Sequence, residues 1–326
     1  MKKRKLTYRE AIRECLFEQL NKDKKVILLG EDIGLYGGAH RVTEGLLEQF
    51  GSKRIYDTPI SELGFVGMAV GAAMTGLRPI VDIQFSDFLT LPMDQIVNQA
   101  AKVHYMYGGQ LSVPLVIRTP SGAGTGAASQ HSQSLEAWFA HVPGLKVVQP
   151  SNAYDAKGLL HEAVEDENPV IFFEHKLLYN QASHVPNTYY KIPFGQANVL
   201  QEGDDVTVVA TGVMVSRVLE AAKELSSYIS VEVIDPRTLV PLDMATIIKS
   251  VEKTGKLIVV HEAVERYGIG AEIVSQVVER AFDALTCAPL RLAGEAVPIP
   301  NNKELERFAI PQVGAIVEAI KSIHTI

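Results

Sequence analysis

The stretch Asp57-Thr-Pro-Ile-Ser-Glu-Leu-Gly-Phe-Val-Gly-Met-Ala-Val-Gly-Ala-Ala73 predicts a turn followed by a helix. Pro59 favours the turn, and Ser61 stands at the expected N-cap, so Glu62 falls in the first helical turn. The glycines and alanines beyond Glu62 let such a helix pack close to other backbone. The apolar run over 63–77 is shorter than the roughly 18 residues that a bilayer span needs. We therefore expect a core helix that begins near Glu62.

Short apolar runs on both sides of this helix have the length of buried strands. They alternate with helical patterns, the first of which follows a capping box formed by Thr7 and Glu10. This alternation predicts an α/β fold with a parallel sheet covered by helices. The expected strands are 26–29, 79–85, 114–117, 146–148 and 170–173, and the expected helices are 8–20, 93–106 and 154–164.

The pattern breaks at 186–203, where the sequence is polar and contains proline and glycine, and then resumes. The second half predicts strands at 206–210, 231–234 and 257–260 and helices at 213–226, 244–252 and 270–285. A length of 326 residues, of which 47% are hydrophobic, suits two domains. We place them at 1–190 and 191–326.

Composition excludes several classes of partner. The net charge is −7, and the only dense basic run, Lys2-Lys3-Arg4-Lys5, is expected to be a solvated tail, so we expect no nucleic acid. Neither a membrane span nor a charged-then-apolar leader is visible, which favours a cytoplasmic protein.

Two motifs suggest other chemistry but lack its full pattern. Gly122-x-Gly124-x-x-Ala127 is a degenerate dinucleotide fingerprint, yet no apolar helix start follows it and the next strand ends in Gln149 instead of an acidic residue. We therefore favour an active-site loop, or a glycine loop that binds no phosphate. His-Glu-Ala-Val-Glu occurs at 161–165 and 261–265, but neither copy has a second histidine at i+4, so we expect no metal there.

Several further motifs resemble one enzyme family over nearly the whole chain, from about residue 6 onward. They are Gly30-Glu-Asp-Ile-Gly34, Arg54-Ile-Tyr-Asp-Thr-Pro-Ile-Ser-Glu62, Gly76-Leu-Arg-Pro79, Ala128-Ser-Gln-His-Ser-Gln133, Pro143-Gly-Leu-Lys146, Asn168-Pro169 and Asp235-Pro-Arg-Thr-Leu239. The chain is similar to the beta subunits of the thiamin-diphosphate-dependent dehydrogenase component of 2-oxo acid and acetoin dehydrogenase complexes. The resemblance implies an N-terminal transketolase-like pyrimidine-binding domain and a C-terminal transketolase-like α/β domain.

The resemblance also implies roles for individual residues. Glu62 would hydrogen-bond the aminopyrimidine ring of the cofactor and promote the tautomer that activates the thiazolium carbon. Phe88 would pack on that ring, and Gln84 and Ile60 would line the site. His131 would lie at the mouth of the active site, where an imidazole can move protons.

The other half of the cofactor site is expected from another polypeptide. Thiamin enzymes hold the diphosphate and Mg²⁺ with a Gly-Asp-Gly motif, and this chain has none. The resemblance thus implies an alpha subunit that supplies that half-site in an α₂β₂ heterotetramer, docked on a lipoyl acyltransferase core. It also implies a possible structural K⁺, held by Leu115, Ala163, Val164, Asp166 and Asn168.

The implied reaction is oxidoreductase chemistry, in which the substrate is cleaved and an acyl unit passes to lipoamide. The runs 169–180 and 189–193 favour acetoin as the substrate, then pyruvate, then branched-chain 2-oxo acids. Three alternatives remain open: a transketolase-like or deoxyxylulose-phosphate-synthase-like enzyme, a non-catalytic assembly subunit, and a nicotinamide dehydrogenase.

Overall fold

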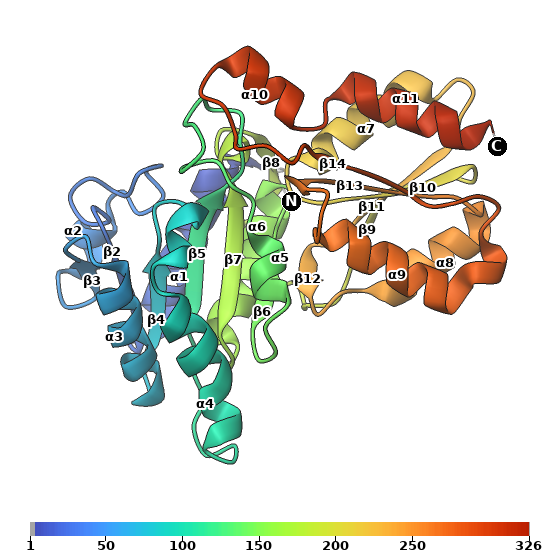
Figure 1. The fold of residues 1–326 in the computed structure, drawn as a ribbon. Coiled ribbons are helices and arrows are strands. Elements are labelled where there is room, and N and C mark those ends of the chain that lie inside the picture. The colour runs from blue at the N-terminus through green and yellow to red at the C-terminus, as the bar shows by residue number, and fades with distance from the viewer. Residues whose placement is uncertain (1–3, 326) are drawn as a thin grey trace. The chain divides into compact units, whose positions relative to one another are not determined.

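The computed structural model describes residues 4–325 and divides them into two compact units (Figure 1). The N-terminal unit contains the chain up to residue 121 together with 138–194. The C-terminal unit contains 122–137 and the chain from 195 onward. The linear division at 190/191 stays a prediction, and contacts within the structure group 122–137 with the C-terminal unit.

The N-terminal unit is built on a parallel sheet whose strands run in the order β6-β7-β5-β4-β2-β3. β2, β5 and β7 are buried along their whole length, as a parallel sheet covered on both faces requires. The predicted strand 146–148 is confirmed, and each end of the other four lies within four residues of the observed end. The strands are β2 (Val26–Gly30), β3 (Ile55–Asp57), β4 (Arg78–Asp82), β5 (Val116–Ser121), β6 (Lys146–Val148) and β7 (Val170–His175).

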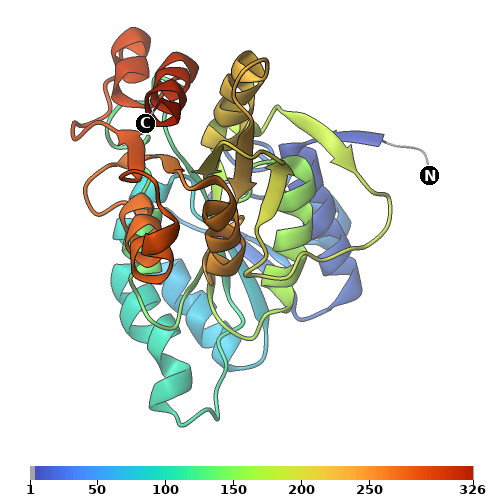
Figure 2. The same ribbon diagram turned by 90° about the vertical axis from the view of Figure 1, so that its right-hand side faces the viewer.

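Helices cover both faces of this sheet. Figures 1 and 2 together place α3 (Glu62–Met74) and α4 (Ala101–Met106) on one side, and α1 (Tyr8–Lys22) and α6 (Ala153–Glu165) on the other. The capping box of Thr7 and Glu10 starts α1 as predicted. The predicted helix 93–106 is only partly α-helical, because its first half is a π-helical turn, η2 (Gln95–Ala100). The remaining short helices of this unit are α2 (Leu46–Phe50), η1 (Ser86–Thr90) and η3 (Lys176–Leu178), and α5 (Glu136–Ala140) spans the division between the units.

The basic run near the start of the chain is partly built into the fold. β1 (Arg4–Thr7) pairs antiparallel with β8 (Ala182–Val185), and the Arg4 guanidinium forms an ion pair with Glu14. The expected solvated tail is therefore wrong for Arg4; Lys5 belongs to β1 but is exposed, and Lys2 and Lys3 lie outside the described residues.

The C-terminal unit has a mixed sheet in the order β14-β13-β10-β11-β9, with β9 antiparallel to its neighbour. Figure 1 shows α7 and α11 on one side of this sheet and α8 and α9 on the other. The predicted strand 206–210 is confirmed, and the helices α10 and α11 were not predicted. The elements are β9 (Asn198–Gln201), β10 (Val206–Ala210), α7 (Met214–Leu225), β11 (Val231–Asp235), β12 (Thr238–Val240), α8 (Met244–Thr254), β13 (Leu257–Val264), α9 (Ile269–Ala281), η4 (Phe282–Ala284), β14 (Leu290–Gly294), α10 (Lys303–Ala309) and α11 (Val313–His324).

Within residues 4–325, every helix is too short or too polar to span a bilayer. The relation of the chain to a cellular compartment therefore stays a prediction.

Candidate active site

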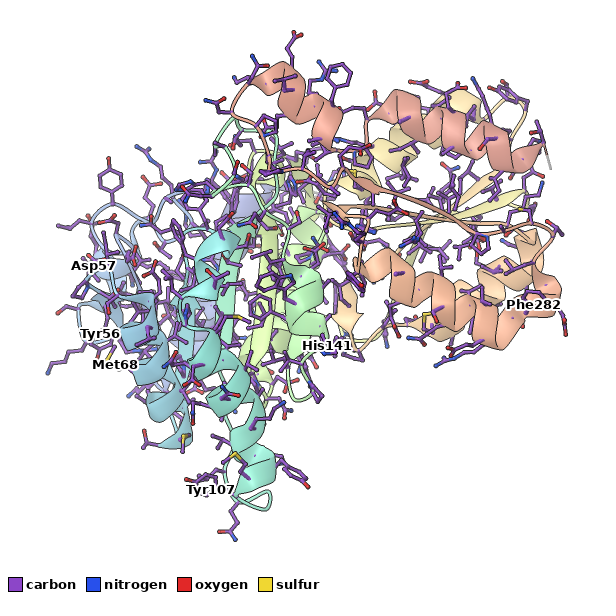
Figure 3. The ribbon with its side chains drawn as sticks, in the orientation of Figure 1. Tyr56, Asp57, Met68, Tyr107, His141 and Phe282 are labelled. Carbon is purple, nitrogen blue, oxygen red and sulfur yellow. The ribbon has the colours of Figure 1, made fainter. Side chains whose placement is uncertain are left out.

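Four carboxylates gather at the carboxyl end of the N-terminal sheet, and we call them the acidic edge. Because β3 and β4 flank β2 in parallel register, Asp57 and Asp82 lie opposite Gly30, and Glu31 follows directly. Ligands of open α/β sheets bind at this end of the strands. Figure 3 labels Asp57 at the end of β3 and Met68 farther along α3. The acidic edge consists of Glu31, Asp57, Glu62 and Asp82.

Glu62 is the first residue of α3, and its side chain is only 7% exposed. The helix begins where the sequence predicts, but Ser61 does not cap it: within residues 4–325 its side chain makes no capping hydrogen bond. The buried carboxylate therefore lies at the positive end of a helix that lacks a side-chain cap.

Glu31 is a functional candidate that the sequence analysis missed. It is as buried as Glu62, and its Oε1 has no hydrogen-bond partner among the described residues. Burial, together with the negative charges of Glu62, Asp32 and Asp82, raises the pKa of Glu31 to about 7. A buried acid with one unsatisfied oxygen beside a second carboxylate is typical of a place where a ligand supplies the missing hydrogen bond.

The other predicted residues of this half-site come from segments next to the acidic edge. Phe88 is half-buried in η1, and its ring meets Phe85 edge-on at 5.8 Å. The Gln84 amide nitrogen lies 3.5 Å from Asp32 Oδ2. Ile60, two residues before Glu62, is 83% exposed in this chain. The structure thus leaves Phe88 and Ile60 accessible, not packed into the core.

A buried ion network lies behind the acidic edge. The Arg118 guanidinium donates to both carboxylate oxygens of Glu174 at 2.8 Å and to Asp82 at 2.5 Å, and the Tyr179 hydroxyl also donates to Glu174. Burial would lower the pKa of Arg118, but Glu174 and Asp82 together raise it above its ordinary value. A permanent positive charge therefore offsets part of the negative charge of the edge.

His40 completes the surroundings. Its ring stacks on Tyr179 at a centroid distance of 4.5 Å, and burial lowers its pKa to about 4. The imidazole is therefore neutral at physiological pH, and no positive charge is added to the edge.

His131 belongs to the other unit. It lies in the segment 122–137, is half-buried, and its backbone N–H donates to the Ala128 carbonyl at 3.3 Å. The N-terminal unit holds Glu62, Gln84, Phe88 and Ile60, so the predicted catalytic residues are divided between the two units.

The predicted K⁺ ligands lie around the end of α6. Arg78 donates to the carbonyls of Val164 and Asp166 at 3.1 Å, and Lys146 forms an ion pair with the Asp166 carboxylate. The Leu115 and Ala163 carbonyls accept backbone N–H groups, and Asn168 donates to Asp166. A K⁺ ion at this place would stand beside the positive charges of Arg78 and Lys146, so this ligand set stays a prediction.

Comparison with known proteins identifies the family. Residues 4–181 match the transketolase pyrimidine binding domain, and 195–316 match the transketolase C-terminal domain. The chain is 49% identical to the pyruvate dehydrogenase E1 component subunit beta of Rickettsia felis, with 98% of each chain covered. This chain belongs to the transketolase-like family of 2-oxo acid dehydrogenase E1 beta subunits.

Other E1 beta subunits show the range of the family. A mitochondrial pyruvate dehydrogenase E1 subunit beta of Oryza sativa is 47% identical over 98% of this chain and 86% of its own. The acetoin:2,6-dichlorophenolindophenol oxidoreductase subunit beta of Bacillus subtilis is 45% identical, with 96% of each chain covered. Among solved structures, a split-gene transketolase described as an inactive beta4 tetramer has a TM-score of 0.79 at 23% identity and covers 98% of this chain and 99% of its own, which shows a shared fold.

Proposed function

We propose that this E1 beta subunit carries the pyrimidine-binding half of a thiamin diphosphate site and acts on pyruvate. The observation that carries the proposal is Glu62, a buried carboxylate at a helix start beside Glu31, whose Oε1 has no hydrogen-bond partner within residues 4–325. Relatives from several organisms named as pyruvate dehydrogenase subunits are 45–49% identical to the chain, and they support pyruvate better than the acetoin that the sequence analysis favoured.

The residues at the acidic edge fit the aminopyrimidine ring of the cofactor. When bound, thiamin diphosphate supplies the carbon nucleophile that attacks the substrate carbonyl and allows the adjacent carbon–carbon bond to break. Glu62 accepts a hydrogen bond from a protonated ring nitrogen, in a site with little water where such a pairing is strong. Phe88 would pack on the ring, and Gln84 and Ile60 would limit its movement.

Glu31 limits the charge at this site. Because its pKa is about 7, Glu31 holds a proton for much of the time at neutral pH. A protonated Glu31 offers a hydrogen-bond donor beside Glu62 and avoids the repulsion that its own negative charge would add to the acidic edge.

The diphosphate and its Mg²⁺ are assigned to an alpha subunit, because the chain contains no Gly-Asp-Gly motif. The assembly we propose is an α₂β₂ heterotetramer that hands its acyl product to the lipoyl group of an acyltransferase core. His131 is the residue we assign to proton transfer during that handover.

The deciding experiment is calorimetric titration of thiamin diphosphate, with Mg²⁺, into this chain alone and into the chain co-purified with its alpha subunit. We expect tight binding only in the complex. Tight binding to the chain alone would place the diphosphate site here and contradict the divided site.

Glu62→Gln in the complex tests the proposed chemistry. We expect overall activity to fall at least a hundredfold, about 3 kcal/mol in the activation barrier, because the amide cannot stabilise the protonated ring. Glu48→Gln is the matched control, since Glu48 lies in the first turn of α2 but is exposed. Equal activity of both variants would leave an assembly subunit as the better description.

Substrate choice is tested by steady-state rates on pyruvate, acetoin and branched-chain 2-oxo acids. We expect the highest kcat/KM with pyruvate. Acetoin is the second candidate because the Bacillus subtilis acetoin oxidoreductase subunit is nearly as similar as the pyruvate relatives.

The K⁺ proposal is tested separately. Thermal unfolding in K⁺ and in choline should differ for the unsubstituted chain and converge in Asp166→Ala. A Tm that is equal in both salts would remove the cation from the proposal.

A further inference from the structure

The segment 122–137, which we call the glycine loop, has an unusual backbone. Gly122, Gly124, Gly126 and Ala128 all have positive φ, between 64° and 100°, whereas the residues between them do not. Alternation of this kind turns successive N–H groups toward one side and forms a concave anion site, called a nest. In many proteins such a nest holds a phosphate.

Two carboxylates of the same unit occupy these N–H groups. The Ala123 N–H donates to Glu262 Oε1 at 2.5 Å, the Gly124 N–H to Glu306 Oε1 at 2.7 Å, and the Gly126 N–H to Glu306 Oε2 at 3.0 Å. Glu306 is only 2% exposed and Glu262 only 9%. The N–H groups of the nest are therefore already bound by carboxyl oxygens from β13 and α10.

This occupancy explains why the glycine pattern resembles a dinucleotide fingerprint without being one. A phosphate at Gly124 and Gly126 would have to displace a buried carboxylate that binds both N–H groups. The spacing is required by the loop conformation, and the ligand is a side chain of the protein.

The carboxylates fix the part of the loop that carries His131. On the chain before His131, the Ser129 hydroxyl donates to the Ile299 carbonyl at 2.9 Å; after it, the Gln133 carbonyl accepts the Gly122 N–H at 3.2 Å. Because Gly122 is only two residues from Gly124, the Gln133 end of this short arc is joined to the occupied nest, while the Ser129 end is tied to residue 299, on the segment that leads into α10.

We propose that Glu306, assisted by Glu262, is a positioning residue that holds the glycine loop so that the His131 imidazole lies where it can transfer a proton. The inference rests on the proposed function of His131. The hydrogen bonds that Glu306 accepts from the loop come from backbone N–H groups, so we expect its effect on the reaction to pass through the position of the imidazole.

Amide hydrogen exchange on the full chain tests the structural part without any assay of function. In Glu306→Ala we expect the amides of 122–131 to exchange about ten- to a hundredfold faster, as loss of hydrogen bonds to a charged group implies. Glu304→Ala is the matched control, because Glu304 is an exposed acid on the same helix. Unchanged exchange in Glu306→Ala would overturn the proposal.

A double-variant cycle in the complex with the alpha subunit tests the functional part. If Glu306 acts through His131, Glu306→Ala slows the acyl transfer step about tenfold in the parent but adds nothing to His131→Ala. Glu306→Gln keeps one acceptor oxygen, so its rate of acyl transfer should lie between those of the parent and of Glu306→Ala. Added formate should restore part of the activity of Glu306→Ala.

The outcomes separate the two proposals. Equal slowing of the parent and of His131→Ala by the Glu306 substitution contradicts the positioning role, whatever the role of His131. Full activity of His131→Ala contradicts the proposed function of that histidine. Faster exchange in Glu306→Ala would still show that Glu306 holds the glycine loop.

Discussion

The acidic edge of the N-terminal unit and the glycine loop of the C-terminal unit both contain buried glutamates, but the groups around those glutamates differ. At the edge, Glu31 faces Glu62 and Asp82, and its pKa rises to about 7. At the loop, Glu306 receives two backbone N–H groups. A buried carboxylate surrounded by carboxylates lacks donors and suits a ligand that brings them; one surrounded by amides is already satisfied and holds structure.

The test with the largest expected effect concerns Glu174, which loses its cationic partner if Arg118 is replaced. Arg118→Met should lower the free energy of unfolding by about 3–5 kcal/mol, because it leaves a fully buried carboxylate without its cation. Urea denaturation measures the loss. Arg41→Met, at an exposed arginine, is the control, and a loss below about 1 kcal/mol at Arg118 would show that burial in this network is not costly.

Glu136 is the exception inside the glycine loop, and it sharpens the comparison. It is 1% exposed, its Oε2 has no partner among residues 4–325, and burial beside Glu262 raises its pKa to about 7. The folded state therefore keeps a proton that the unfolded state loses above pH 4.5, and stability falls as pH rises from about 4.5 to 7.

Glu136→Gln should remove this dependence. The variant should be more stable than the parent by up to about 3 kcal/mol at pH 8 and by little at pH 4. Denaturant titrations at the two pH values measure the difference, and a variant that loses stability at pH 8 would show that Glu136 has a partner when ionised.

The same substitution at the acidic edge should also raise the stability at high pH. We expect Glu31→Gln to stabilise the chain by about 2 kcal/mol at pH 8, less than at Glu136 because the edge is closer to solvent. Glu48→Gln should change nothing by comparison. If Glu31→Gln destabilised the chain, the edge would be structural and not a binding surface.

Replacing Asp243 should have the smallest effect on stability, and here the native carboxylate stabilises the fold at neutral pH. Burial opposes its ionisation, but hydrogen bonds from Thr246 and from the Ala197 N–H lower its pKa below the ordinary value. Its contribution is present above pH 3.8 and is lost as pH falls through the lowered pKa. Asp243→Ala should cost about 1 kcal/mol at pH 7 and less at pH 3, measured by thermal unfolding.

The sequence predicts the elements that carry their own signal. Strands such as 26–29 are entirely apolar, and the helix that starts at Glu62 has a turn before it. β1 and β8 were missed because their pairing joins residues about 180 positions apart, and β14 because it is only half-buried. The π-helical turn at η2 has the same apolar composition as an α-helix.

The site follows the same rule. Glu62 and His131 were found from local motifs, but their roles remain proposals. Glu31 and Glu306 were missed because what marks them is their neighbours in space: three acids in one case, and two amides about 180 positions away in the other. No local pattern contains that information.

The chain leaves the N-terminal unit at residue 121, returns at 138, and leaves again at 194. The two units are thus not modules that recombination can exchange with one cut. A hybrid of two relatives joined near residue 190 would inherit its glycine loop from one parent and the glutamates that hold it from the other. Recombination between relatives can therefore exchange these halves only where the glycine loop and the glutamates that bind it remain compatible.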